Sequence, residues 1–200
     1  MATLLGQRKT KTISITSGKG GVGKTTLVCN LAYSLARQGK KVLIFDGDLG
    51  MANVDVMFGM RTEHNIHELI SGQIELSQLI TPMGVGIDLI SGGSGVVELN
   101  RLDSFQRRAM MESLHSLDGL YDYMIIDTAP GISENVLYLN SAVQEVALII
   151  NPDPASITDA YALIKVLHQE YKEKHFNIIC NQVRDEVEGL ALFHRFNEVV

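Results

Sequence analysis

The residues with the clearest capacity for chemistry lie in one glycine-rich stretch, Ser17-Gly18-Lys19-Gly20-Gly21-Val22-Gly23-Lys24-Thr25. Its glycines let consecutive backbone N–H groups turn inward around a phosphate without interference from Cβ atoms. Lys24 can then reach the terminal phosphates of a nucleotide, and the Thr25 hydroxyl can ligate Mg²⁺. Because the spacing from Gly18 to Thr25 fits the pattern GxxxxGK[ST], the stretch predicts a phosphate-binding loop.

A strand and a helix should position this loop. Polar and apolar residues alternate over residues 12–16, as in a strand, and residues 27–37 have helical character. The amino end of a helix adds partial positive charge beside the phosphates. This context favours a phosphate loop over an ordinary glycine turn. The nucleotide contacts expected in the loop are Gly18, Lys19, Gly20, Gly21, Val22, Gly23, Lys24, Thr25 and Thr26.

Three aspartates follow apolar runs typical of strands that are buried on both faces. Asp46 and Asp48 come after residues 42–45, and Asp127 comes after residues 123–126. Ligands of open α/β sheets bind at the carboxyl ends of the strands, so these carboxylates should face the nucleotide. Asp127 has the position of a Walker B acid, which holds Mg²⁺, usually through a water molecule. Taken singly, Asp127 could also be a turn residue, and Asp48 a helix-capping acid.

Strand-like and helix-like segments alternate along the rest of the chain. The expected elements are strands near residues 86–91, 146–150 and 176–180, and helices near residues 63–71, 76–80, 99–117, 133–142, 155–171 and 186–200. Phe105 is among the residues expected on the buried face of the long helix. This alternation predicts an α/β fold with a doubly wound, mainly parallel sheet, as one domain over residues 1–200. No stop signal ends the last helical pattern, so we expect the fold to continue beyond Val200.

Composition narrows the function classes. The chain has 200 residues, 46% of them hydrophobic, which suits one domain with a sizeable core. A net charge of −6 argues against general nucleic-acid binding. Cys29 and Cys180 form no CxxC pair and are expected in the core, and no apolar run reaches the roughly 18 residues of a membrane span. Together with the lack of a signal peptide, these features indicate a cytoplasmic protein.

Residues 63–68 contain two histidines and two glutamates that could suggest a metal site: Glu63, His64, His67 and Glu68. Residues three or four apart on a helix can share a face. A zinc site needs about four ligands, however, and the sequence offers no second cluster to complete one. We therefore expect a solvated helix start here.

The loop contains a second lysine, Lys19, which on its own could be simply a solvated side chain. The run Lys-Gly-Gly-Val-Gly-Lys-Thr resembles the deviant phosphate loop of the MinD/ParA family of ATPases. In that family the first lysine crosses a dimer interface to the nucleotide of the partner. The resemblance therefore implies this role for Lys19, a P-loop NTPase of the MinD/ParA type, ATP and Mg²⁺ as cofactors, and a homodimer that forms with ATP.

The resemblance also assigns roles at the site. The residues implied in catalysis are Lys19, Lys24 and Asp48, the last of which would orient the attacking water from switch I. Those implied in holding Mg²⁺ are Thr25, Asp46 and Asp127, with Asp46 supporting the shell of the ion. An aspartate with an ordinary pKa is a weak base at neutral pH, so the contribution of Asp48 would be positioning and electrostatics.

Three further positions match the family. Residues 127–132 resemble switch II, in which the Gly131 N–H would lie near the γ-phosphate and the glycine would let the loop reset. Asn181 matches the asparagine that reads the adenine edge, although an asparagine after a strand is more often a turn residue. Residues 151–154, followed by Ser156 and Asp159, resemble a dimer-facing segment, where an acid could meet the Lys19 of the second chain.

Residues 48–59 and 128–133 are similar to one branch of the family, the flagellar-number regulators called FlhG or FleN. This similarity implies slow ATP hydrolysis and control of flagellar number or placement at the inner face of the membrane. The implied partners are flagellar proteins, namely a GTPase, a transcription regulator or a basal-body component. An amphipathic membrane helix would lie beyond Val200, and residues 1–10 do not show the GTPase-activating helix with which such proteins often begin.

Alternative functions remain open at this point. A MinD-like division-site ATPase has the same switch, but MinD usually carries an arginine at position 52 and a different order in switch II. A ParA-like partitioning ATPase would need a basic surface, which the acidic balance disfavours. An ATP-dependent phosphotransferase or ligase would need a second substrate pocket. Electron transfer of the nitrogenase type is a poor fit, because residues 92–95 and 128–133 contain no cluster cysteine.

Overall fold

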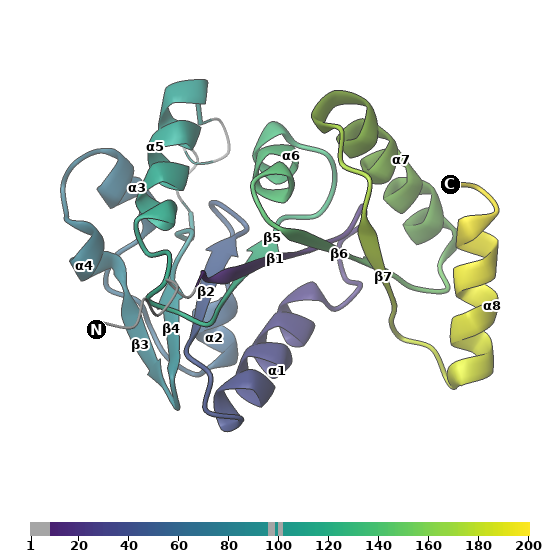
Figure 1. Ribbon diagram of the computed structural model, residues 1–200, viewed down its shortest axis with the longest axis horizontal. Coiled ribbons are helices and arrows are strands. Elements are labelled where there is room, and N and C mark those ends of the chain that lie inside the picture. Colours follow the sequence, from purple (N-terminus) through teal and green to yellow (C-terminus); the bar gives the residue numbers. More distant parts are fainter. Residues whose placement is uncertain (1–8, 96–98, 100–101) are drawn as a thin grey trace, which may run out of the picture.

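The computed structural model describes residues 9–95, 99 and 102–200, and a seven-stranded sheet forms its centre (Figure 1). The strand order is β3-β4-β2-β5-β1-β6-β7. All neighbours are parallel except β3 and β4. The strands are β1 (Lys11–Thr16), β2 (Val42–Gly47), β3 (Thr81–Gly84), β4 (Ile87–Ile90), β5 (Tyr123–Thr128), β6 (Glu145–Ile150) and β7 (Phe176–Cys180). The predicted doubly wound, mainly parallel α/β fold is confirmed.

Helices cover both faces of the sheet (Figure 1). They are α1 (Lys24–Arg37), α2 (Val54–Met57), α3 (Ile66–Ile70), α4 (Leu76–Leu79), α5 (Ser104–His115), α6 (Glu134–Ser141), α7 (Pro154–Tyr171) and α8 (Glu186–Asn197). Helix α1 packs on the face that carries Ile44, whereas α5 packs on the face that carries Phe45. This alternation along β2 follows from the period of two in a strand. No described helix is long and apolar enough to cross a bilayer.

The register of the central strands brings the predicted acids together. β2 and β5 pair in parallel, with Asp46 directly beside Asp127. The carboxyl ends of β1, β2 and β5 therefore meet at one edge of the sheet, where the β1–α1 loop also begins. Every residue of β2 is buried, as expected for a strand covered on both faces.

Two predictions about elements were wrong. The long helix begins at Ser104 rather than Leu99, because Asp103 caps it by accepting a 2.8 Å hydrogen bond from the Gln106 N–H. Phe105 is 79% exposed instead of buried. β3 was not predicted; it is a four-residue antiparallel edge strand that contains Pro82, and proline is tolerated in an edge strand.

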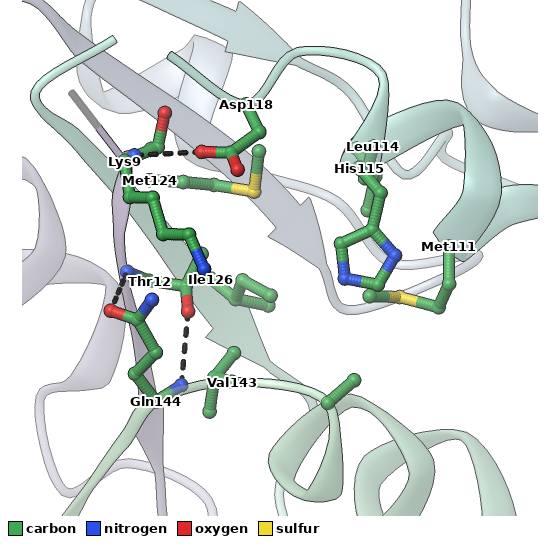
Figure 2. A pocket seen from close by; sticks show the side chains of 12 residues that line it. Lys9, Thr12, Met111, Leu114, His115, Asp118, Met124, Ile126, Val143 and Gln144 are labelled. Carbon is green, nitrogen blue, oxygen red and sulfur yellow. Dashed lines mark hydrogen bonds between the residues drawn. The ribbon is translucent and has the colours of Figure 1, made fainter. Parts of the chain in front are cut away.

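A pocket of about 200 Å³ lies at the opposite edge of the sheet, where β1 and β5 begin (Figure 2). It is bounded by the start of β1, the end of α5 and the α6–β6 connection. We call it the amino-edge pocket. Its lining residues are Lys9, Thr10, Thr12, Met111, Leu114, His115, Asp118, Met124, Ile126, Ala142, Val143 and Gln144.

Candidate nucleotide-binding site

The glycine loop joins β1 to α1, and its backbone conformation explains why glycines stand there. Gly21 and Gly23 have φ angles of 78° and 96°, in the left-handed region that favours glycine. A Cβ atom on Gly23 would lie 2.5 Å from Nδ2 of Asn181. In front of the loop lies a cavity of about 410 Å³. It is lined by Gly20, Gly21, Gly23, Lys24, Thr25, Thr26, Asp48, Asn53, Thr128, Pro130 and Gln182.

Lys24 is the first residue of α1, and its side chain is buried. Its ammonium group donates a 2.9 Å hydrogen bond to Ser17 Oγ, which in turn donates a 2.7 Å bond to the Lys19 carbonyl. Burial lowers the pKa of Lys24, while the charges of Asp127 and Asp48 oppose this shift. A cation removed from water in this way gains strongly from an anionic ligand. The environment of Lys24 therefore suits a bound phosphate.

Asp127 has the features expected of a metal-supporting acid. It is 1% exposed, and its Oδ1 atom has no hydrogen-bond partner among the described residues. Burial raises its pKa to about 7, against a hydrogen bond from the Thr25 side chain that lowers it. A buried carboxylate oxygen without a partner calls for an explanation, and an oxygen-binding cation supplies one. Thr25 and Asp127 together offer the hard oxygen donors that Mg²⁺ prefers.

Asp46 makes different contacts from those of Asp127. Its carboxylate accepts hydrogen bonds of 2.8 Å from the Asn53 N–H and 2.9 Å from the Val54 N–H, at the start of α2. A third bond, of 3.3 Å, comes from the Asp48 N–H. Burial raises the pKa of Asp46 to about 6, and these bonds oppose the shift. Asp46 therefore anchors the segment that carries Asp48. The carboxylate that accepts hydrogen bonds from the first N–H groups of α2 is that of Asp46, not that of Asp48.

Asp48 is half-buried and lines the cavity. Burial raises its pKa, and the charge of Lys24 opposes the shift. On the far side of the loop, the Gly131 N–H donates a 2.9 Å hydrogen bond to the Ser17 carbonyl. The N–H expected near the γ-phosphate is thus engaged with the loop strand, and switch II would have to move to free it.

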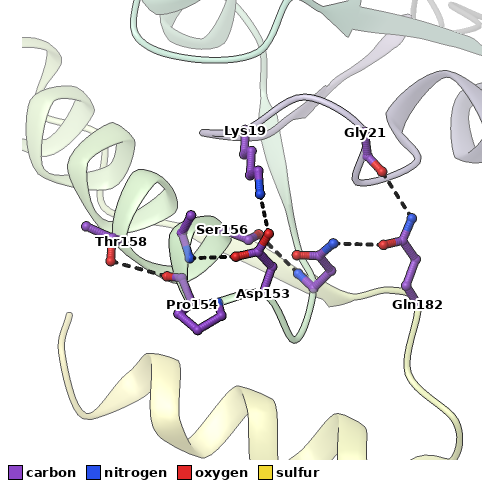
Figure 3. Close-up of polar contacts among 9 residues, drawn as sticks. Lys19, Gly21, Asp153, Pro154, Ser156, Thr158 and Gln182 are labelled. Atoms are coloured by element: carbon purple, nitrogen blue, oxygen red, sulfur yellow. Dashed lines mark hydrogen bonds and ion pairs between the residues drawn. The ribbon is translucent and has the colours of Figure 1, made fainter.

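Lys19 forms an ion pair with Asp153 of the same chain (Figure 3). Asp153 is also the N-cap of α7, where its Oδ1 accepts a 2.9 Å hydrogen bond from the Ala155 N–H. The bond from Lys19 and that from the Ala155 N–H lower the pKa of Asp153. Asp153, one of the two acids in the segment expected to face a second chain, is therefore paired with the Lys19 of its own chain.

Two amides close the other side of the loop. Asn181 Nδ2 donates a 2.8 Å hydrogen bond to the Val22 carbonyl, and Gln182 Nε2 donates a 3.0 Å bond to the Gly21 carbonyl. Asn151 Nδ2 in turn donates to Gln182 Oε1 over 2.7 Å (Figure 3). Gln182 has a φ angle of 58°, unusual for a residue other than glycine. These amides fix the position of the loop carbonyls.

The histidine-rich segment has a structural role. Glu68 accepts hydrogen bonds from the Asn65 N–H at 3.2 Å and pairs with His64 Nδ1 at 2.9 Å. Asn65 and Glu68 form a capping box at the start of α3. Over residues 9–95, 99 and 102–200, no group of three or more His, Cys, Asp or Glu residues could hold a metal ion.

Comparisons with known proteins decide the family. A protein-family model described as an AAA domain matches residues 10–179. The chain is 36% identical over 187 residues to the antiactivator FleN of Pseudomonas aeruginosa, a match that covers 94% of this chain and 67% of FleN. The chain belongs to the MinD/ParA-type AAA family. This is a family of ATP-binding NTPases.

Other members of the MinD/ParA-type family support this placement. The flagellum site-determining protein YlxH of Helicobacter pylori is 39% identical over 190 residues, which cover 95% of this chain and 64% of YlxH. The structure of the septum site-determining protein MinD of Pyrococcus horikoshii with Mg-ADP superimposes with a TM-score of 0.76 at 28% identity. That match covers 96% of this chain and 77% of MinD. The chain spans about two thirds of the length of the two flagellar relatives.

The predicted site residues of this MinD/ParA-type chain fall into two groups, those at the cavity and those bonded to other parts of the protein. Lys24, Thr25 and Asp48 border one cavity, with Asp127 buried behind Thr25. In contrast, the Asp46 carboxylate and the Gly131 N–H form hydrogen bonds with other parts of the protein, namely the Asn53 N–H and the Ser17 carbonyl. The roles given to these residues remain predictions, and their positions are now known.

Two features of the MinD/ParA-type site were not predicted from the sequence. Gln182 follows Asn181 at the carboxyl end of β7, and that position was the only signal for it. The second feature is a buried polar network beneath the switch II segment. The Thr128 hydroxyl donates a 2.9 Å bond to Thr16 Oγ1, which also accepts a 3.2 Å bond from Asn140 Nδ2. The polar residues that alternate with isoleucines in β1 could have revealed it.

Proposed function

We propose that this chain is an ATP-dependent dimerisation switch that hydrolyses ATP slowly and regulates the number or placement of flagella. The observation that supports this most directly is the convergence of Lys24, Thr25 and Asp48 on one cavity, with the buried Asp127 carboxylate behind them. Residues 1–200 would form one nucleotide-binding domain of the switch. The reaction would convert ATP and water to ADP and phosphate.

In this proposal the loop binds the triphosphate through backbone N–H groups, and Lys24 balances its charge. Thr25 and Asp127 would hold Mg²⁺, with Asp46 in support by fixing the segment that starts α2. When bound, Mg²⁺ neutralises charge that develops on the phosphate oxygens. Gly131 would donate its N–H to the γ-phosphate after leaving the Ser17 carbonyl.

Asp48 would orient the attacking water at the mouth of the cavity. The new bond joins the water oxygen to the γ-phosphorus, and the bond from the γ-phosphorus to the bridging oxygen breaks, so that ADP leaves. Phosphoryl transfer is loose, and positioning therefore matters more than proton abstraction. Asn181 would recognise the adenine with its amide, since an amide offers both a donor and an acceptor.

Lys19 would connect the nucleotide to dimerisation. Within one chain it pairs with Asp153, and both side chains are partly exposed. To reach the nucleotide of a second chain, Lys19 would have to leave Asp153. A homodimer with ATP would thus form at the cost of this internal pair.

The flagellar role rests on the relatives. FleN is named an antiactivator and YlxH a flagellum site-determining protein. A flagellar GTPase, transcription regulator or basal-body component would read the ATP-bound dimer, at the inner face of the membrane. MinD is the second candidate, since its structure with Mg-ADP is similar to this chain. The net charge of −6 makes a DNA-binding partitioning role less favourable.

Light scattering after gel filtration tests the switch, with ADP and with ATP. We expect Asp48→Ala to keep ATP and to double in mass with ATP only, because hydrolysis no longer releases the dimer. Lys24→Ala is the matched control and should bind no nucleotide and stay monomeric. An Asp48→Ala protein that binds ATP but remains monomeric would contradict the switch, and normal turnover by it would remove Asp48 from the reaction.

A further inference from the structure

Asn140 lies in the last turn of α6, where it is fully buried and does not border the nucleotide cavity. Every polar group of its side-chain amide has a partner. Oδ1 accepts a 2.7 Å hydrogen bond from Ser14 Oγ, and Nδ2 donates bonds of 2.8 Å to the Val136 carbonyl and 3.2 Å to Thr16 Oγ1. A buried amide with three partners cannot rotate without leaving a polar group unsatisfied. Asn140 therefore fixes α6 against the carboxyl end of β1.

Thr16 connects Asn140 to switch II. It is the last residue of β1, directly before the glycine loop, and Thr128 is the last residue of β5, at the start of switch II. The hydroxyl groups of these threonines are 2.9 Å apart, and neither side chain is more than 1% exposed. Thr128 also borders the nucleotide cavity. The hydrogen bonds thus extend from a buried position on a helix to the wall of the cavity.

The residue before Asn140 in α6, Leu139, packs against the end of β2. A Cβ atom on Gly47 would lie 2.8 Å from Leu139 Cδ1 and 3.0 Å from the Asp127 carbonyl oxygen, so this close approach requires a glycine. Gly47 stands between Asp46 and Asp48. The last turn of α6 therefore contacts the ends of both β1 and β2, and it reaches the end of β5 through the pair of threonine hydroxyls.

Switch II is anchored at one end only. Thr128 is buried, whereas Pro130 and residues 132–134 are exposed. Gly131 lies among these exposed residues with a φ angle of 94°, and its N–H is bonded to the Ser17 carbonyl. A glycine in this conformation gives the backbone freedom to change its path. Movement that frees the Gly131 N–H would therefore take place at the exposed end, while the end at Thr128 stays in place.

We propose that Asn140 is a positioning residue for ATP hydrolysis. It holds the end of β5 against the end of β1, so that Asp127 keeps its place beside Thr25 while the exposed end of switch II leaves the Ser17 carbonyl. This inference rests on the proposed function, which assigns the hydrolytic reaction to the site. A misplacement of about 1 Å can lower turnover ~100-fold, so Asn140 would affect kcat although it touches no reacting group.

Steady-state ATP hydrolysis by Thr16→Val tests the proposal, because valine has nearly the shape of threonine but no hydroxyl group. We expect kcat to fall about tenfold or more and KM to change by less than about twofold, since the lost interaction positions rather than binds. Thr16→Ser keeps the hydroxyl and should retain most of kcat. Ser14→Ala is the matched control. It removes the bond on the other side of the Asn140 amide, leaves the link to Thr128 intact, and should change kcat by less than about twofold.

Hydrogen–deuterium exchange without nucleotide gives a readout that does not depend on turnover. In Thr16→Val and in Asn140→Leu, the amides of residues 126–133 should exchange at least about threefold faster than in the wild type, whereas those of α1 should be unchanged. The same amides in Ser14→Ala should exchange as in the wild type. If Asn140→Leu does not fold, the comparison of Thr16→Val with Thr16→Ser and Ser14→Ala still decides the question.

A wild-type kcat in Thr16→Val would overturn the proposal. An equal loss of kcat in Thr16→Val and Ser14→Ala would also overturn it, because the buried network would then act only through stability. Unchanged exchange of residues 126–133 in Thr16→Val would have the same consequence. Failure of the proposed function would instead appear as a wild type that does not hydrolyse ATP, or as full turnover by Asp48→Ala. The exchange measurement would still show whether the network positions switch II.

Discussion

At the scale of single residues, the site is assembled from polar groups that give up their hydration. Asp127 is the clearest case, with a buried carboxylate oxygen that no described group satisfies. Asp46 is equally buried but receives three backbone N–H groups. Unsatisfied buried charge destabilises a fold. The free protein therefore carries an energetic cost at Asp127 that a bound cation would relieve.

The first prediction follows from this cost. The pKa of Asp127 is raised to about 7 from the ordinary value of 3.8, so the folded state binds the proton more tightly. The stabilisation that comes from proton binding at Asp127 is fully present below pH ~4. It is lost as the pH rises to ~7, which lowers the free energy of unfolding by at most about 4 kcal/mol. We expect Asp127→Asn, free of nucleotide and metal, to have a higher Tm than wild type at pH 8.

The measurement is thermal unfolding of both proteins at pH 5 and pH 8, with EDTA. The difference in Tm should shrink at pH 5, where the wild-type carboxyl is protonated. The charge of Asp46 also raises the pKa of Asp127, so the comparison reports the relief of this repulsion together with the burial of Asp127. Adding Mg-ATP should stabilise the wild type but not the variant. A variant less stable than wild type at pH 8 would show that the carboxylate is stabilising without its cation.

At the scale of elements, the phosphate loop is fitted against the start of α7. A Cβ atom on Gly18 would lie 2.2 Å from the backbone carbonyl carbon of Asp159. The contact is with backbone, which cannot rotate away. The loop also accepts hydrogen bonds at the Val22 carbonyl from Asn181, just after β7, and at the Ser17 carbonyl from Gly131 of switch II. The loop therefore moves with its neighbours rather than alone.

We predict that Gly18→Ala destabilises the protein by about 1–3 kcal/mol, the usual cost of overpacking, and weakens ATP binding. For stability, Gly20→Ala is the matched control, because a Cβ atom there meets nothing closer than 3.8 Å and its backbone is not left-handed. Urea denaturation and nucleotide titration measure both effects. Equal stability of the two variants would mean that α7 shifts easily.

Much of this arrangement could be predicted from the sequence. Strands buried on both faces, such as β2 and β5, have unmistakable apolar runs, and the parallel topology then aligns Asp46 with Asp127. The start of α5 was wrong because apolar spacing continues past the cap at Asp103. Contacts between loops, such as Lys19 with Asp153, depend on the path of both loops in space. No pattern within either segment encodes them.

At the scale of the whole molecule, Lys19 and Asp153 link the chain to its proposed dimer. We predict that Asp153→Asn, which keeps an N-cap residue at α7 but removes the charge, strengthens ATP-dependent dimerisation. Water and salt screen an exposed ion pair, so the gain in dimer affinity should be only a few-fold.

Analytical ultracentrifugation of Asp153→Asn with ATP, in the Asp48→Ala background, measures this effect. Lys19→Ala is the companion variant and should bind ATP but stay monomeric. Dimerisation that becomes weaker in Asp153→Asn would instead mean that Asp153 meets the Lys19 of the second chain. The two arrangements thus predict opposite effects of Asp153→Asn on dimer affinity.

The two edge strands of the sheet, β3 and β7, differ in how readily another strand could pair with them. On one side, β3 is short, antiparallel and interrupted by Pro82, features that blunt pairing with another strand. On the other side, β7 is parallel, contains no proline and hydrogen-bonds only to β6 within the described residues. Additional strands, whether from a longer chain or from another molecule, would therefore join at β7. The same border is where uncontrolled self-association would begin.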